Sequence, residues 1–198
     1  MGFQMVEKND KKFSGSIPQF YDTYMVPLIF EEFAKDLALR TASAPIENVL
    51  EIAAGSGVVT RELAPMLGPD SKYMVTDFNQ DMLDHAKLKQ TKDKRISWQQ
   101  ADATNLPFAE DTFDTLICQF GVMFFPDKIK SYKEARRVLK ANGRFLFNVW
   151  DSLQENEFPQ IIASTAASIF PNNPPNFLGR TPYGYYDLKL IRKGLEAA

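Results

Sequence analysis

The clearest chemistry in this sequence lies in a short segment of small residues, 51–57. It reads Glu-Ile-Ala-Ala-Gly-Ser-Gly, so that Ala53, Gly55 and Gly57 would let a ligand approach the backbone closely. The helical pattern that follows would present unpaired N–H groups and a positive dipole end, which suit a carboxylate or a phosphate. The Glu51 carboxylate would repel a pyrophosphate and attract an ammonium group. A purely structural strand-to-helix turn is the alternative interpretation.

Two aspartates follow the next two apolar segments of the chain. Asp77 ends the segment 72–77, and Asp102 comes directly after the segment 96–101. Asp77 has about the spacing of an acid that binds ribose hydroxyls. The carboxyl ends of parallel strands meet at one edge of a sheet, so both side chains should lie near the 51–57 segment. Simple capping or loop roles remain open for both aspartates.

The elements that must position these residues alternate along the chain. Short apolar segments are separated by helical patterns, among them 58–67, a helix after Asn79, and one over 129–139 that ends at Asn142-Gly143. The apolar segments are 49–53, 72–77, 96–101, 113–119 and 144–150. Strands alternating with helices predict an α/β fold, here a Rossmann-like three-layer sandwich with a mostly parallel sheet.

The flanks of this core differ from it in composition. We expect a flexible tail over 1–12 and a single domain over 13–198, with a helical cap over 13–42, a ligand-binding core over 46–150 and a helical or lid segment over 151–198. In the cap, Pro18 lies near the start of a first helix, and Pro27 predicts the start of a second. In the last segment we expect a helix over 156–169, a Pro- and aromatic-rich stretch over 170–187 and a final helix over 188–198.

Composition excludes several classes of protein. The 198 residues carry 23 Lys and Arg against 25 Asp and Glu, which gives no general attraction to nucleic acid. One cysteine and one histidine exclude a disulfide framework and a structural zinc site, and we expect no metal. No apolar run reaches the ~18 residues of a membrane span. With no secretion signal at 1–12, we expect a cytoplasmic protein.

The remaining polar candidates have simpler interpretations. His85 lies in the helix after Asn79 and is expected to be solvated. Cys118 lies in an apolar strand and is expected to be a small buried residue. A group of basic residues is expected to form a solvated helix face: Lys128, Lys130, Lys133, Arg136, Arg137 and Lys140.

At four places the sequence resembles the class I S-adenosylmethionine-dependent methyltransferases. VLEIAAGSGVVT resembles their motif I, with Ala53 in place of its first Gly, and MVTDFNQDML resembles their second motif. QADATNLPFAEDTFDTLIC resembles the third and fourth motifs, and EARRVLKANGRFLF resembles the entry to the fifth strand. The match covers about residues 46–150 and is closest to the ubiquinone/menaquinone biosynthesis branch.

This resemblance implies roles for individual residues. The backbone at Ala53, Gly55 and Gly57 would face the methionine part of S-adenosylmethionine, with Glu51 near its amino group. Asp77 would bind the ribose hydroxyls. The remaining implied contacts are Phe78 and Met82 beside the adenine, Asp102 and Ala103 at its edge, and Gln119 near the sulfonium. Tyr21, on an aromatic N-terminal helix, is a candidate lid residue over the same site.

The resemblance also implies a reaction, methyl transfer to a small-molecule acceptor. Aromatic residues near the expected mouth favour an apolar or planar acceptor. They are Phe20, Tyr21, Tyr24, Phe120, Phe124, Phe125, Phe177 and Tyr183. The sequence identifies no catalytic base. A non-catalytic S-adenosylmethionine-binding module is the alternative, and a nucleotide-dependent oxidoreductase is disfavoured by Thr60 at the sixth position of the dinucleotide pattern and by Glu51.

The end of the chain departs from the family pattern. The family completes a seven-stranded sheet, whereas this chain stops where strands six and seven would begin. We therefore expect five strands, with 144–150 as an exposed edge, and either a truncated polypeptide or a homodimer that covers this edge.

Overall fold

A single parallel sheet forms the centre of the molecule, which the computed structural model describes from residue 15 to residue 198. The tail expected over 1–12 lies outside the described residues. Four parallel pairings join the strands in the order β3-β2-β1-β4-β5. The strands are β1 Asn48–Glu51, β2 Lys72–Asp77, β3 Ile96–Gln100, β4 Phe113–Gln119 and β5 Leu139–Asn148. The order reverses between β1 and β4, and such a reversal opens a crevice at the carboxyl ends of the strands.

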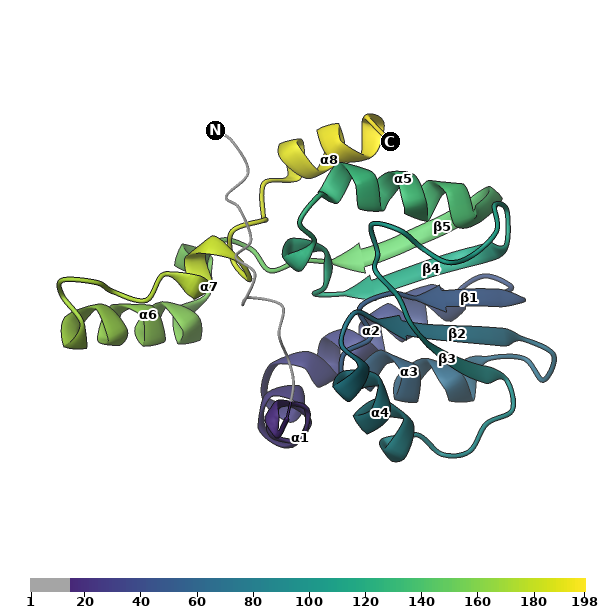
Figure 1. The fold of residues 1–198 in the computed structure, drawn as a ribbon, viewed down its shortest axis with the longest axis horizontal. Helices are drawn as coiled ribbons and strands as arrows, with labels where there is room; N and C mark the ends of the chain where they lie inside the picture. Colours follow the sequence, from purple (N-terminus) through teal and green to yellow (C-terminus); the bar gives the residue numbers. More distant parts are fainter. Residues whose placement is uncertain (1–14) are drawn as a thin grey trace.

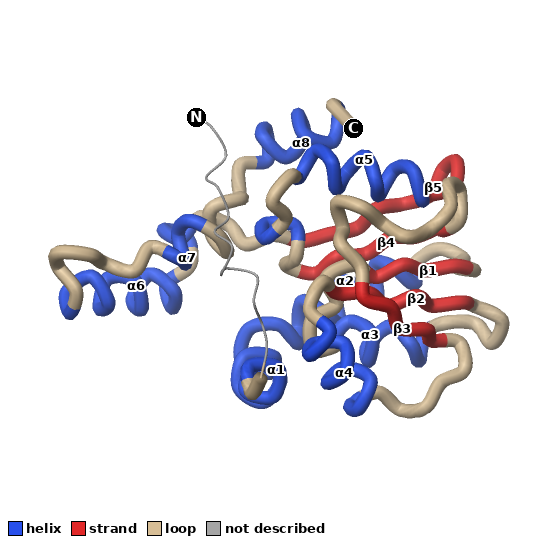
Figure 2. Tube along the Cα trace, viewed as in Figure 1, coloured by secondary structure: helices blue, strands red, loops and turns tan. Residues whose placement is uncertain are grey.

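Helices cover both faces of this sheet (Figures 1 and 2), which confirms the expected three-layer α/β fold. Helices α2, α3 and α4 pack on one face, and α5 and α8 lie on the other. The helices are α1 Ile17–Phe20, the π-helix η1 Tyr21–Phe30, α2 Glu31–Ala42, α3 Val58–Leu63, α4 Gln80–Lys89, α5 Lys128–Val138, α6 Glu157–Ile169, α7 Phe177–Arg180 and α8 Leu188–Glu196. Short 3₁₀ turns occur at Ala64–Met66, Val122–Phe124 and Leu153–Glu155.

The two central strands supply the core. Val49 and Leu50 of β1 and Leu116 and Ile117 of β4 are fully buried. Successive side chains point to opposite faces of a strand, so a run of adjacent buried residues requires cover on both faces. The continuous apolar segments in the sequence are explained by these two helical layers.

Two predicted boundaries are wrong, each for a local reason. Pro27 does not begin a second helix, because it lies inside η1, and the chain is helical from Ile17 through Ala42. Asn142 and Gly143 do not separate α5 from the last strand. β5 begins at Leu139 and passes a register shift before Arg144, so that this pair belongs to an irregularity within the strand.

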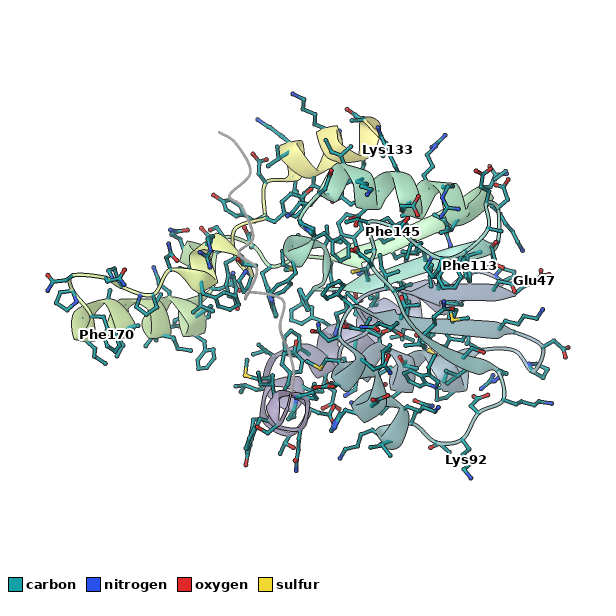
Figure 3. All side chains as sticks on the ribbon, in the orientation of Figure 1. Glu47, Lys92, Phe113, Lys133, Phe145 and Phe170 are labelled. Carbon is teal, nitrogen blue, oxygen red and sulfur yellow. The ribbon has the colours of Figure 1, made fainter. Side chains whose placement is uncertain are left out.

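Beyond β5 the described chain adds helices and loops but no further strand, so the sheet has five strands, as expected. β5 lies at the sheet edge, and its pairing with a second copy stays a prediction. Helices α6 and α7 project from the core (Figure 1), and Figure 3 places Phe170 at the outer end of this projection, far from Glu47 and Phe113. No helix in the described part of the chain has the length and apolar character that a membrane crossing needs.

Candidate functional site

One cavity of about 260 Å³ opens at the carboxyl ends of the strands. Most of the residues singled out from the sequence line it, although they come from distant parts of the chain. They are Tyr21, Ala53, Gly55, Asp77, Phe78, Met82, Asp102, Ala103 and Gln119. The fold therefore brings together the residues that follow β1, β2, β3 and β4, as expected where a parallel sheet reverses its order.

The loop after β1 is held in a left-handed conformation. Ala53, Gly55 and Gly57 have φ angles of 53°, 57° and 79°. The Ala54 N–H donates to the Thr76 carbonyl at 3.0 Å, which fixes the loop to β2. A Cβ at Gly57 would lie 2.9 Å from the Ala86 Cβ, so glycine there allows the loop and α4 to pack closely. Gly57 faces this contact and is not part of the cavity lining.

Asp77 connects this loop to the start of α4. One of its carboxylate oxygens accepts the Gly55 N–H at 2.8 Å, and the other accepts the Asn79 N–H at 2.7 Å. Burial raises the pKa of Asp77, although these hydrogen bonds act in the opposite direction. The carboxylate lines the cavity with further acceptor capacity, which suits a ligand with hydroxyl donors.

The structure corrects the expected place of Glu51. Its side chain is 2% exposed and does not line the cavity. Thr60 donates a hydrogen bond to its carboxylate at 2.7 Å, and the Tyr73 hydroxyl donates another. Burial raises the pKa of Glu51 to about 7, against the effect of these two donors. Glu51 is the last residue of β1, and its carboxylate is bonded to α3 through Thr60 and to β2 through Tyr73.

Asp102 and Ala103 line the cavity from the turn after β3. The Asp102 carboxylate accepts both the backbone N–H and the hydroxyl of Thr104 at 2.8 Å. A backbone bridge from Asp102 to Asn105 closes the same turn. The carboxylate is thus fixed in orientation beside the cavity.

Gln119 ends β4 at the centre of the cavity wall. Its amide nitrogen donates to the Phe30 carbonyl at 3.2 Å. Its amide oxygen is buried and has no hydrogen-bond partner among the residues that the structure describes. A buried acceptor without a partner is rare in folded proteins, and a donor or a positive charge on a ligand would satisfy it.

Aromatic side chains form the far end of the cavity. The Phe120 ring stacks on Trp150, with centroids 3.9 Å apart and an interplanar angle of 5°. Tyr183 lies 5.8 Å from Trp150, and Phe177 of α7 lies 6.5 Å from Phe124. All five side chains line the cavity, so this end suits a flat apolar ligand.

Some predictions about aromatic and polar residues need correction. Phe20 and Tyr24 are 57% and 63% exposed and lie outside the cavity lining. His85 is not solvated, because it packs against Asp22 with its side chain 15% exposed. Lys128 is not on a solvated face either, since its ammonium donates to the carbonyls of Met123 and Phe125 at 3.3 and 3.0 Å. Cys118 is buried as expected.

Several lining residues were not predicted from the sequence. Trp150 follows the carboxyl end of β5, where an aromatic residue is a usable signal, because strand ends form the site. The others come from η1 and from the segments beside α5 and α7, where no sequence pattern marks them: Met25, Ile29, Phe30, Pro126, Leu178 and Pro182.

Comparison with known proteins gives concordant matches. The model of the ubiE/COQ5 methyltransferase family matches residues 15–170. A demethylmenaquinone methyltransferase of Lactobacillus johnsonii is 39% identical over 117 residues, which cover 58% of this chain and 46% of that protein. A ubiquinone/menaquinone biosynthesis C-methyltransferase, UbiE, of Rickettsia bellii is 30% identical over 78% of this chain and 68% of its own length.

The solved structures agree on the fold. The YcgJ protein of Bacillus subtilis superposes with a TM-score of 0.60 at 24% identity, covering 84% of this chain and 67% of that one. At this level of identity the similarity establishes the fold alone. The chain spans about half the length of curated relatives that it matches, such as the demethylmenaquinone methyltransferases of Lactobacillus johnsonii and Lactococcus lactis.

Proposed function

This chain belongs to the ubiE/COQ5 methyltransferase family, and from that premise we propose that it transfers a methyl group from S-adenosylmethionine to a small, planar and apolar acceptor. The names of its relatives suggest a quinone-type ring as the acceptor and carbon as the methylated atom. One observation carries the proposal. A single cavity has backbone and carboxylate groups at one end, near Gly55 and Asp77, and stacked aromatic rings at the other, near Trp150.

The residues present fit the cofactor. The unpartnered Gln119 amide oxygen offers a negative partial charge to a sulfonium or an ammonium group. Asp77 has acceptor capacity for two ribose hydroxyls, and the fixed Asp102 carboxylate can accept from an adenine amino group. Phe78 and Met82 provide apolar surface on the adenine side.

The chain's own contribution to the reaction is to align the two substrates and to exclude water from the cavity. When bound, the cofactor supplies a methyl group on a good leaving group, so that alignment of the acceptor carbon with the C–S bond is the main task. The aromatic end of the cavity would hold the acceptor plane and exclude water. Burial raises the pKa of Tyr183, so its hydroxyl stays protonated at neutral pH and can donate a hydrogen bond to an oxygen of the methyl acceptor.

Binding and turnover test the proposal together. Calorimetry with S-adenosylhomocysteine should show saturable binding, and NAD should show none. Asp77→Asn should lower the affinity for S-adenosylhomocysteine about tenfold or more, because the charge beside the ribose hydroxyls is lost. The matched control is Asp70→Asn, at an exposed turn residue outside the cavity.

Methyl transfer should then occur to a naphthoquinol that lacks the ring methyl group, and not to a strictly polar acceptor such as glycine. Transfer only to polar acceptors would reject the apolar-acceptor proposal. Binding of S-adenosylhomocysteine without transfer to any acceptor would favour the non-catalytic module.

A further inference from the structure

The segment that carries Tyr21 is weakly buried in the fold. Between Ile17 and Met25, only Pro18 is buried. From Tyr21 to Phe30 the segment is a ten-residue π-helix, which is a rare conformation, and this helix includes Pro27. Apolar packing alone therefore attaches the first half of this segment poorly, even though Tyr21 forms part of the cavity wall.

A partly buried cluster of polar side chains supplies a second attachment. One Asp22 carboxylate oxygen lies 2.7 Å from the Arg61 guanidinium, and the other lies 3.3 Å from the His85 ring nitrogen. The three side chains are 10%, 27% and 15% exposed, so water screens this cluster much less than a surface pair. The Arg61 charge and the donors around Asp22 outweigh burial and hold the pKa of this carboxyl below its ordinary value.

The partners of Asp22 belong to the two elements that build the cofactor end of the cavity. Arg61 lies on α3, and its second guanidinium nitrogen donates to the Ser56 carbonyl at 2.7 Å, within the loop 53–57. His85 lies on α4, one turn after the cavity-lining Met82. A single carboxylate therefore ties the π-helix to the loop after β1 and to the helix after β2.

The neighbouring residue faces the other way. Tyr21 lines the cavity and stacks on Phe30 with centroids 5.1 Å apart. Tyr21 and Asp77 line the same cavity, and burial together with the charge of Asp77 raises the pKa of the Tyr21 hydroxyl. Because Tyr21 and Asp22 are adjacent, fixing the Asp22 carboxylate fixes the Tyr21 ring over the cavity.

We infer that Asp22 is a positioning residue for the cofactor: its paired contacts with Arg61 and His85 lock Tyr21 over the cofactor end of the cavity. This inference rests on the proposed function, because it requires the cavity to bind S-adenosylmethionine. Asp22 itself does not line the cavity. Its effect on binding therefore has to pass through Tyr21.

A thermodynamic cycle on cofactor affinity tests the inference. In calorimetry, Asp22→Ala and Arg61→Ala should each lower the affinity for S-adenosylhomocysteine by about tenfold or more. In steady-state assays they should raise KM for S-adenosylmethionine and leave kcat at saturation within about twofold. Asp36→Ala is the matched control, because Asp36 pairs with Arg40 at the same 2.7 Å on the exposed face of α2; it should leave both constants unchanged.

The decisive experiment repeats Asp22→Ala in a protein that lacks the Tyr21 side chain. In a Tyr21→Ala background, Asp22→Ala should cause no further loss of affinity, since nothing remains for it to position. An equal loss in both backgrounds would show that Asp22 acts independently of Tyr21 and would overturn the inference. So would unchanged affinity in Asp22→Ala when the wild type binds.

Thermal unfolding measurements distinguish a variant that has lost affinity from one that has lost its folded structure. Every variant is titrated at least ~10 °C below its own Tm, where the folded state dominates. Asp22→Asn keeps the shape of the side chain but removes its charge and replaces one acceptor oxygen with a donor, so it should also lower the affinity, by no more than Asp22→Ala. If wild-type protein binds no S-adenosylhomocysteine, the proposed function fails first, and this outcome is distinct from equal binding by wild type and variants.

Discussion

Gly121 offers a sharp test of how the cavity wall is packed. It follows Phe120 and lines the cavity beside the loop after β1. A Cβ at this position would lie 2.5 Å from the Ala53 Cβ and 2.7 Å from the Cys118 sulfur. Neither neighbour can easily move: the Ala53 Cβ is fixed directly to a backbone at φ 53°, and Cys118 is fully buried.

The expected cost of Gly121→Ala follows from these two contacts. Forcing one extra carbon into a packed interior typically destabilises a protein by about 1–3 kcal/mol. For a chain of this length, each kcal/mol corresponds to roughly 2–4 °C in Tm, so the variant should melt about 2–12 °C lower. Because Ala53 lines the cavity, a shift of Ala53 should lower the affinity for S-adenosylhomocysteine together with the stability.

Two further variants identify the clash as the cause. Ala53→Gly removes the nearer of the two atoms and relieves a left-handed alanine that costs roughly 1–2 kcal/mol. The double variant Gly121→Ala with Ala53→Gly should therefore recover part of the lost Tm. The control is Gly179→Ala, where the nearest atom, Leu153 Cδ2, is at an ordinary 3.5 Å, and Tm should stay equal or rise slightly.

Differential scanning calorimetry on the wild type and these four variants measures the differences in Tm. A Gly121→Ala variant that melts with the wild type would refute the packing argument. A double variant that melts no higher than Gly121→Ala would show that Ala53 is not the obstacle.

Three other predictions concern two buried ionisable groups and the partly buried Trp150. Burial raises the pKa of Glu51 to about 7, so the folded chain retains this proton to a higher pH than the unfolded chain. As pH rises from about 4.3 to 7, the free energy of unfolding of the wild type should therefore fall by up to about 3 kcal/mol relative to that of Glu51→Gln. Urea unfolding at pH 5 and pH 8 measures this, and a constant gap would contradict it. Burial lowers the pKa of Lys128 to about 8, so the unfolded chain binds more protons between pH 8 and about 10.4. Wild type should therefore gain stability relative to Lys128→Met over that range, and parallel stability curves would argue against a buried ammonium. Trp98→Phe leaves Trp150 as the single tryptophan of the chain, and its fluorescence should change saturably with the quinol acceptor; a silent titration would place the acceptor elsewhere.

The strands were predictable because their signal is local. β2 and β4 have the predicted bounds, since continuous apolar segments between turn residues specify buried strands. β5 was predicted to begin five residues and to end two residues too late, and the late start arises because Asn142-Gly143 is typical both of a helix end and of an irregular strand. Only the pairing of Leu139 with Phe113 distinguishes the two, and that contact is invisible in a local pattern.

The site was predictable where topology alone determines it. Asp77 and Asp102 follow parallel strands, so the fold brings them to one edge without any knowledge of packing. Glu51 was misplaced because strand alternation, which points it inward, competed with a motif that suggested ligand contact. The Asp22–Arg61 pair spans 39 positions and depends on how η1 lies across α3, which no sequence pattern specifies.

Backbone strain gives independent support for the location of the site. Among the described residues, the non-glycine positions with positive φ are Ala53, Asp111, Phe120 and Asn142. Asp and Asn tolerate this conformation because their short polar side chains can hydrogen-bond locally, whereas Ala and Phe have no such compensation. Ala53 and Phe120 both line the cavity, at the carboxyl ends of the two central strands, with Gly121 packed against Ala53.

The Phe120 N–H is held by the Asn148 side chain at 2.9 Å, so neighbouring structure fixes this conformation before any ligand arrives. Uncompensated backbone strain that the fold maintains in two adjoining loops of one cavity is typical of a functional site. It implies that the loops after β1 and β4 bind their ligand with little rearrangement.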